Sequence, residues 1–356
     1  MFEKYKPTEA DFRKAEDMMT SEQKRASEIR ERYWEQKQPN WGNFEKEFVE
    51  NSKRKPAGKN EIEIMDRNIE ALGDALEGFE GRWVLDGSLN ISLMKEEYIG
   101  LHKDMDISVE EADLKALEEH LDKKGYGLFF SEIDGKDRIA RRVGHRKFAD
   151  LAKENIHGVI LAIDKDGKID ESRDWFVIDV HVLAKNDKGN PIGFHGAKFS
   201  EEWMQTTLRR GINVSHPARV LYYKMYEERS YDVSDVKELM ELGRISSDDL
   251  DEVERVLRED NENLLERVRR IVSEVFNDLS DSTNQEEIYR VFNKHPEVII
   301  NDEEMEKGFR ELSRRIGVME DFSLQGVLGL VLETFNIDRR FESRIERIRN
   351  MREKSK

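Results

Sequence analysis

Residues 86–109 read DGSLNISLMKEEYIGLHKDMDISV, and the second half of this stretch has the pattern of a β-strand. The apolar residues Met105 and Ile107 alternate with Asp104 and Asp106, and a period of two places both carboxylates on one face. Two carboxylates on one face repel each other unless a cation lies between them. Oxygen ligands of this kind suit Mg²⁺, which binds through one or two carboxylates together with substrate phosphates. The pattern therefore predicts either a metal-binding strand or a solvated strand edge, since acid pairs are common in an acidic chain.

The same stretch resembles the active-site segment of the polymerase-β-like nucleotidyltransferase superfamily, and within it the lincosamide/aminoglycoside nucleotidyltransferase branch. That branch carries a D-G-G-W-like segment followed by H-K/R-D-I/M-D-I/L, which residues 86–89 and 102–107 match as DGSL and HKDMDI. Ser88 and Asp104 are 16 positions apart, which is the longer separation of this branch. The two matching segments therefore also have the spacing of the branch.

Three departures concern the acceptor more than the nucleotide. Ser88 and Leu89 stand where the branch usually has Gly and Trp, although Gly87-Ser88 agrees with the Gly-Ser pair of the wider superfamily. Ser92 lies near the position where antibiotic-modifying members frequently have an acid. Gly87 still lets a backbone approach a triphosphate, and the Ser88 hydroxyl could donate to it. The departures weaken the expectation of an antibiotic acceptor.

A third acid is expected on a second strand beside the first. Residues 175–183 read WFVIDVHVL, which is rich in β-branched and aromatic side chains and is followed by a turn-like segment. From the residues alone, Asp179 would be a buried acid paired with Lys or Arg. The resemblance instead implies that Asp179 is the third carboxylate of the family, with His181 as its neighbouring histidine.

The resemblance implies a site and its cofactors. Asp104, Asp106 and Asp179 would be catalytic and would bind one or two Mg²⁺ ions, while Gly87 and Ser88 would lie against a nucleoside triphosphate, with ATP as the expected NTP. An acceptor hydroxyl would attack the α-phosphorus and release pyrophosphate. Asp179, or a nearby acid such as Glu132, would accept the proton of the hydroxyl, and the sequence does not choose between them.

Residues 217–239 resemble the helix and following turn of these enzymes, where a D-x-x-D segment is present. Asp232 and Asp235 match that segment. We prefer the interpretation that these residues cap a helix and place an acid in its first turn over a direct role in the chemistry. Lys224 could bind the nucleotide by neutralising a phosphate, because a lysine is a compact point charge. A solvated lysine is the alternative.

Composition limits the classes of protein. The 356 residues are 37% hydrophobic and 38% charged, with a net charge of −17 and no Cys, which excludes disulfides and thiolate zinc sites. No apolar run reaches the roughly 18 residues of a membrane span, and no signal peptide is evident, so we expect a cytoplasmic protein without a membrane partner.

The acidic charge disfavours a main role in binding nucleic acid, although the C-terminal tail is basic. We interpret that tail as the exposed side of a helix; its basic residues are Arg339, Arg340, Arg344, Arg347, Arg349, Arg352, Lys354 and Lys356.

The order of the patterns predicts three regions. Residues 1–60 are expected to form a helical N-terminal extension, residues 61–244 the nucleotidyltransferase domain, and residues 245–356 a helical C-terminal domain. The fold class is α/β in the α+β sense, with a mixed sheet, flanking helices and helical stripes after residue 245. Those C-terminal helices could close over the acceptor site or mediate a homodimer, and the sequence does not separate the two.

The predicted function is Mg²⁺-dependent transfer of a nucleoside monophosphate to a hydroxyl of a small-molecule acceptor. Two alternatives stay open. One is a toxin-like nucleotidyltransferase that modifies tRNA or a protein, which the flanking helices and basic tail favour. The other is a non-catalytic nucleotide-binding homologue, which the presence of all three acids disfavours.

Overall fold

The computed structural model describes part of the chain. Its described residues are 57–99, 104–134, 137–153, 158–167, 170, 177–183, 185, 189–193, 195–204, 206–227, 232–280, 291, 311–316, 318, 322–335 and 337–354. The predicted helical N-terminal extension therefore lies almost wholly outside them. Within these ranges, no helix has the length and apolar character needed to cross a membrane.

The chain divides into two compact units. The first falls within Met1–Ala184 and Ser200–Ile245, and the second within Lys185–Phe199 and Ser246–Lys356. The predicted fold class is confirmed, because a mixed sheet with flanking helices is present together with C-terminal helices. The limits 61–244 and 245–356 remain predictions.

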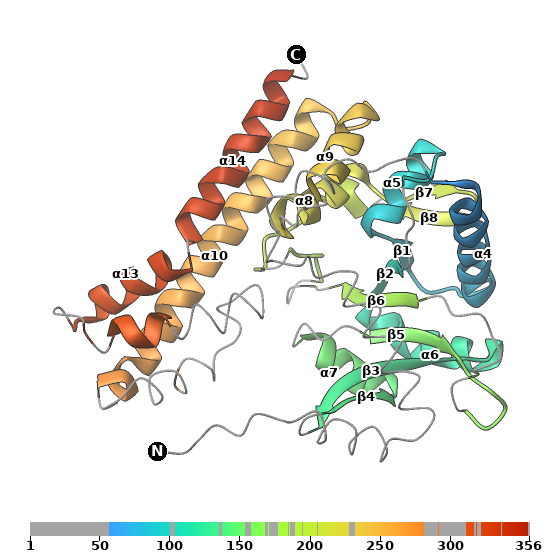
Figure 1. Cartoon of the computed structure of the whole chain (residues 1–356), viewed down its shortest axis with the longest axis horizontal. Coiled ribbons are helices and arrows are strands. Elements are labelled where there is room, and N and C mark those ends of the chain that lie inside the picture. Colours follow the sequence, from blue (N-terminus) through green and yellow to red (C-terminus); the bar gives the residue numbers. More distant parts are fainter. Residues whose placement is uncertain are drawn as a thin grey trace. The chain divides into compact units, whose positions relative to one another are not determined.

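The first unit is built on a mixed sheet with the strand order β4-β3-β5-β6-β2-β1-β8-β7 (Figure 1). The pairs β2–β6 and β1–β8 are parallel, and the other neighbours are antiparallel. Consecutive strands β5 and β6 are therefore paired as a hairpin. The strands are β1 (Trp83–Leu85), β2 (Asp104–Glu110), β3 (Tyr126–Asp134), β4 (Asp137–Arg142), β5 (Gly158–Ala162), β6 (Val177–Leu183), β7 (Thr206–Arg209) and β8 (Ile212–Ser215).

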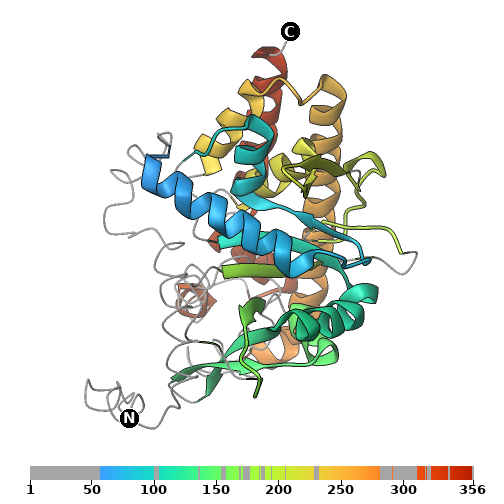
Figure 2. The same ribbon diagram turned by 90° about the vertical axis from the view of Figure 1, so that its right-hand side faces the viewer.

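Helices flank this sheet. Helix α4 is amphipathic, because the side chains of Met65, Ile69 and Leu72 on one face are buried while Ile62 is exposed. Helix α4 crosses in front of the sheet in Figure 2. The described helices of this unit are α4 (Lys59–Leu76), α5 (Gly87–Lys95), α6 (Leu114–Lys124), α7 (His145–Lys153), α8 (Pro217–Glu227) and α9 (Asp232–Glu241), with short 3₁₀ turns η2 (Glu111–Asp113) and η3 (Glu202–Met204).

The second unit contains α10 (Ser247–Ser280), α13 (Leu324–Thr334) and α14 (Ile337–Lys354). Their predicted apolar stripes form a buried core, in which Val268 and Val272 of α10 pack with Val327 and Val331 of α13. The segment Lys185–Phe199 also belongs to this second unit. The Asp260 carboxylate on α10 accepts hydrogen bonds from the backbone N–H groups of His195 and Ala197, at 3.0 and 2.8 Å.

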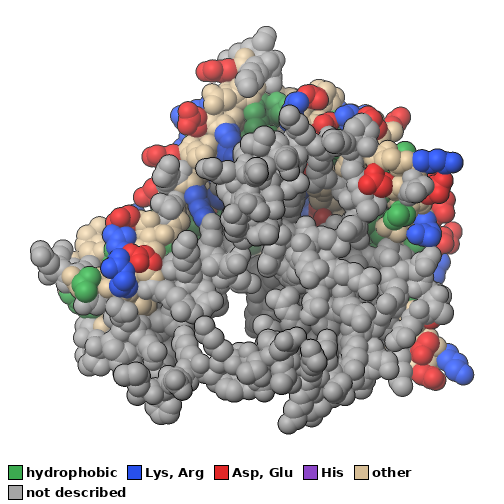
Figure 3. Space-filling view, in the orientation of Figure 1, with side chains coloured by type: hydrophobic (Ala, Val, Ile, Leu, Met, Phe, Trp, Pro, Cys, Tyr) green, Lys and Arg blue, Asp and Glu red, His purple; other side chains and the backbone are tan. Residues whose placement is uncertain are grey.

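The basic tail forms helix α14, as predicted, but the prediction that its arginines are exposed is partly wrong. Arg344 is buried, and Arg352 forms an ion pair with Glu254 of α10 at 3.0 Å. Acidic and basic side chains are interspersed over α10 and α14 in Figure 3. The ion pair with α10 explains why Arg352 is not fully exposed, because opposite charges on facing helices attract one another.

Candidate active site

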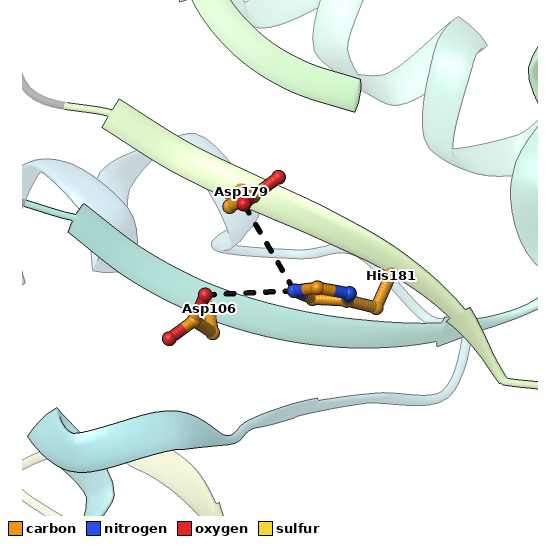
Figure 4. A group of neighbouring side chains, drawn as sticks. All are labelled: Asp106, Asp179 and His181. Atoms are coloured by element: carbon orange, nitrogen blue, oxygen red, sulfur yellow. Dashed lines mark hydrogen bonds and ion pairs between the residues drawn. The ribbon is translucent and has the colours of Figure 1, made fainter. Parts of the chain in front are cut away.

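The parallel pairing of β2 with β6 brings two of the predicted acids together. Asp106 lies directly opposite Asp179 in the register, and His181 follows two residues later on the same strand as Asp179. Figure 4 shows the three side chains pointing toward one another from the two strands. One ligand atom of each lies within 4.8 Å of the others, and these three form a cluster that could hold a metal ion.

The environment of the cluster is graded from buried to exposed. The Asp179 side chain is fully buried, whereas Asp106 is 21% and His181 36% exposed. His181 Nε2 lies 3.5 Å from Asp106 Oδ1 and 4.0 Å from Asp179 Oδ2. A fully buried carboxylate is stable as an anion only beside a positive charge or hydrogen-bond donors. A divalent cation between the two carboxylates would meet that requirement, and access from solvent remains on the side of His181.

The chemistry of these donors fits a divalent cation. Two carboxylates suit Mg²⁺ or Mn²⁺, and an imidazole nitrogen adds a ligand that Mg²⁺ uses less readily than transition metals do. Asp104 begins β2 and its backbone lies opposite Val177, two residues before Asp106. The side chain of Asp104 lies outside the described part of the structure, so its role as a ligand stays a prediction.

The predicted phosphate-binding turn is in contact with this cluster. Gly87 begins helix α5 with φ +71°, a left-handed conformation that favours glycine. A Cβ atom at Gly87 would overlap the Oδ2 oxygen of Asp106. The backbone N–H of Asp86 donates to the carbonyl of Asp106 at 2.8 Å. The first turn of α5 and the acid on β2 are therefore packed against each other through the glycine.

Asp86, whose role the sequence analysis did not predict, is the centre of a buried hydrogen-bond network. Its carboxylate accepts hydrogen bonds from the hydroxyls of Ser108 on β2 and Ser215 on β8, and from Arg219 of α8 at 2.8 Å. Arg219 is 1% exposed. Burial lowers the pKa of Arg219, but the adjacent Asp86 carboxylate and Tyr223 outweigh burial, and the pKa lies above its ordinary value. This network links two strands and α8 immediately before the Gly87–Ser88 turn.

A second buried network holds the other side of the turn. Lys224 of α8 is 4% exposed and lies 2.9 Å from carboxylate oxygens of both Asp232 and Asp235, which are also buried. Lys224 also donates to the Ser88 hydroxyl at 2.9 Å, and that hydroxyl donates to Asp235. The alternative of a solvated lysine is therefore wrong. Both aspartates lie in the first turn of α9, which is where the capping interpretation places Asp235.

The sequence contains only a weak signal for these networks. Asp232 and Asp235 have the spacing of a helix start, and that spacing does not reveal a lysine eight residues upstream as their partner. Asp86 belongs to the D-G-S motif, but nothing in the motif indicates an arginine more than 130 residues away. Side-chain partners from distant segments follow from tertiary packing.

A mixed sheet that brings a glycine turn and two facing carboxylates together is the arrangement expected of a nucleotidyltransferase. Residues 68–239 match the family described as aminoglycoside-2''-adenylyltransferase. The predicted resemblance to the lincosamide/aminoglycoside nucleotidyltransferase branch is thereby confirmed. The matched range contains all six predicted site residues. No curated protein matches the chain.

Three solved structures are similar to this chain at low sequence identity. The lincosamide antibiotic adenylyltransferase LnuA, bound to lincomycin, is 14% identical, with a TM-score of 0.34 over 53% of this chain and 99% of that chain. JHP933 from Helicobacter pylori is 11% identical, with a TM-score of 0.24 over 80% of this chain and 96% of that chain. The Megavirus polyadenylate synthase is 10% identical, with a TM-score of 0.26 over 85% of this chain and 58% of that chain.

Proposed function

We propose that the chain is a Mg²⁺-dependent nucleotidyltransferase that transfers a nucleoside monophosphate from ATP to a hydroxyl of a small acceptor in the cytoplasm, with release of pyrophosphate. One observation supports this proposal above the others. Asp106 and Asp179 face each other on adjacent parallel strands, and the Gly87 turn packs directly on Asp106. This proximity of two candidate metal ligands and a backbone suited to phosphates supports the proposal.

Each residue has a role in this proposal. Asp104, Asp106 and Asp179 would hold Mg²⁺, which offsets the charge of the triphosphate and of the departing pyrophosphate. Gly87 presents no side chain, so a phosphate can approach the N–H groups of the first turn of α5. Ser88 contributes its backbone to this first turn, and Lys224 holds the Ser88 side chain from α8.

The proton of the acceptor hydroxyl needs a base. As the hydroxyl oxygen forms its bond to the α-phosphorus, the bond from that phosphorus to the β-phosphate oxygen breaks, and pyrophosphate leaves. We assign the proton to Asp179 and not to Glu132, because β5 and β6 separate the strand of Glu132 from β2. A base must lie within hydrogen-bond reach of the hydroxyl, which Asp179 satisfies if the acceptor lies beside the metal.

The acceptor is expected to be a cationic small molecule. Residues 61–244 contain 27 Lys or Arg and 38 Asp or Glu, and an acidic region attracts amines. The matched family is described by an aminoglycoside activity, and aminoglycosides carry both amines and hydroxyls. A tRNA acceptor is less compatible, because Arg349 and Arg352 of the basic tail are paired with Glu254.

Transfer of label from α-labelled NTPs tests the proposal. The purified protein would be incubated with Mg²⁺, each NTP in turn, and either a panel of amino alcohols that includes aminoglycosides and lincosamides or total tRNA. We expect label from ATP in a small molecule, and its loss with EDTA and in Asp106→Asn and Asp179→Asn. Asp122→Asn on α6, a surface acid that pairs with Arg142, is the matched control and should retain transfer.

Each other result has a distinct meaning. Label in tRNA would establish the toxin-like alternative, and no label with any NTP would favour the non-catalytic homologue. Full activity in Asp104→Asn or Asp106→Asn would refute the assigned metal site.

A further inference from the structure

Helix α8 supplies a buried cation to each side of the Gly87–Ser88 turn. Arg219 holds Asp86 on one side, and Lys224 holds Ser88 on the other. Gly87 lies between them against Asp106. The turn is therefore fixed at three consecutive residues by partners from α8, α9 and β2, which is more than a helix of nine residues needs for its own start.

The Ser88 hydroxyl has a single proton, and Asp235 accepts it. Lys224 in turn donates to the Ser88 oxygen at 2.9 Å. A phosphate oxygen can only accept a hydrogen bond from a hydroxyl, so the hydroxyl cannot serve Asp235 and a phosphate at the same time. In this arrangement the Ser88 side chain holds the turn in place, and the phosphates meet the backbone.

Lys224 is confined in the same way. Its ammonium lies 2.9 Å from both Asp232 and Asp235, and all three side chains are almost fully buried. Movement of Lys224 to a triphosphate would leave two buried carboxylates without their cation, which is strongly unfavourable. The lysine therefore acts on the nucleotide through Ser88.

We propose that Asp235 and Lys224 are positioning residues that hold the Ser88 hydroxyl, and through it the Gly87–Ser88 turn, in the orientation that receives the triphosphate. This inference rests on the proposed function. It assigns a purpose to the D-x-x-D segment, of which Asp235 contacts Ser88 and Asp232 completes the neutralisation of Lys224.

The direction in which one substitution changes nucleotide affinity distinguishes a positioning role of Asp235 from a purely electrostatic one. Asp235→Asn removes a negative charge from the neighbourhood of a triphosphate, so simple electrostatics predicts equal or tighter nucleotide binding. Positioning predicts weaker binding, because the charged acceptor of the Ser88 hydroxyl is lost. We expect the dissociation constant for a non-hydrolysable ATP analogue with Mg²⁺, measured by calorimetry on the full chain without acceptor, to rise about tenfold.

A double-substitution cycle tests whether Asp235 acts through Ser88. In Ser88→Ala the hydroxyl is absent, so Asp235→Asn should then have no further effect on nucleotide affinity. Independent, multiplying effects of the two substitutions would overturn the proposal. So would an affinity of Asp235→Asn equal to or tighter than that of the natural chain.

Glu238 provides a matched control on the same two helices. It lies one turn after Asp235 on α9 and pairs with Lys95 of α5 at 2.6 Å. Glu238→Gln should leave the nucleotide dissociation constant within about twofold, since a partly exposed pair contributes little. A loss as large as that of Asp235→Asn would mean that general α5–α9 packing is responsible, and the proposal would fail.

Two further measurements keep the outcomes distinct. Thermal unfolding monitors the fold of each variant, and if Asp235→Asn unfolds below the assay temperature, Asp235→Glu takes its place. Asp235→Glu keeps the charge but moves the acceptor oxygen. A positioning role therefore predicts weaker nucleotide binding, whereas an effect of charge alone predicts unchanged binding. If the natural chain binds no nucleotide, the proposed function itself fails; if it binds and Asp235→Glu binds equally well, only this inference fails.

Discussion

Gly87 is the residue at which the proposed phosphate-binding turn and the candidate metal ligands meet. It needs a left-handed backbone, with φ +71°, and it also needs the space that a Cβ would take from Asp106. These two requirements can be separated experimentally, because Gly78 has a similar φ of +79° but open space around the position of its Cβ. If adding a Cβ lowers activity at Gly87 but not at Gly78, the loss must come from the contact with Asp106.

Gly87→Ala is expected to abolish most of the nucleotidyl transfer, whereas Gly78→Ala should lower stability alone. Both substitutions place an L side chain in the left-handed region, which costs about 1–2 kcal/mol. Only Gly87→Ala also displaces the Asp106 carboxylate, and a misplaced metal ligand should reduce kcat by roughly 100-fold. Urea unfolding and transfer kinetics of the two variants provide the comparison. Equal activities would show that the close contact with Asp106 has no catalytic consequence.

Among the elements, α8 connects the turn to the rest of the first unit through the buried Arg219–Asp86 pair. Arg219→Met would leave Asp86 buried without its cation, and we expect a loss of about 3–5 kcal/mol in the free energy of unfolding. The control is Lys124→Met, which breaks an ion pair with Glu77 that is 3.3 Å long but exposed, and which should cost about 0–1 kcal/mol. Tryptophan fluorescence during urea unfolding measures both. Similar losses in the two variants would contradict a structural role for the buried pair.

His195, in the 185–199 segment that contacts α10, predicts a pH dependence of the stability of the second unit. Burial first, and then Arg267 and Arg344, lower the pKa of His195 from its usual 6.5 to about 4. Between these two pH values the unfolded chain binds a proton that the folded chain does not, so this contribution to stability falls as the pH decreases from 6.5 to 4. The loss should approach roughly 3 kcal/mol.

His195→Gln removes this titration. The variant should show a flatter pH dependence of unfolding than the natural chain between pH 6.5 and 4, and no difference in slope above pH 7. Helical circular dichroism is the suitable signal, because residues 185–199 and 246–356 contain no Trp. Parallel pH profiles for the two chains would show that His195 titrates normally in the folded protein.

The elements of the first unit show what a sequence can and cannot predict here. The alternation around Asp106 predicts β2, and the β-branched run around Asp179 predicts β6, because period and composition are local properties. The register that places Asp106 opposite Asp179 joins residues far apart in the chain. The family resemblance implies that Asp179 joins the other acids, but it does not give this register. The partners of Lys224 show the limit, since a lysine on a helix was equally compatible with solvent and its burial depends on α9 packing beside α8.

For the molecule with its two units, the question is which of them responds to nucleotide. All five Trp residues lie outside the ranges of the second unit, and the two described ones, Trp83 and Trp203, belong to the first. Tryptophan fluorescence therefore reports unfolding of the first unit, while circular dichroism also includes the helices α10, α13 and α14.

Mg²⁺-ATP should stabilise the fluorescence-detected transition of the natural chain but not that of Asp179→Asn. A ligand at 100 times its dissociation constant adds about 2.7 kcal/mol to the state that binds it, enough to raise the midpoint of thermal unfolding by several degrees. The shift should require the metal, because in the proposed site the ion that EDTA removes would join the triphosphate to Asp106 and Asp179. A shift that persists in EDTA or in Asp179→Asn, or that appears only in the circular dichroism signal, would place the nucleotide away from the β2–β6 carboxylates and contradict the proposed site.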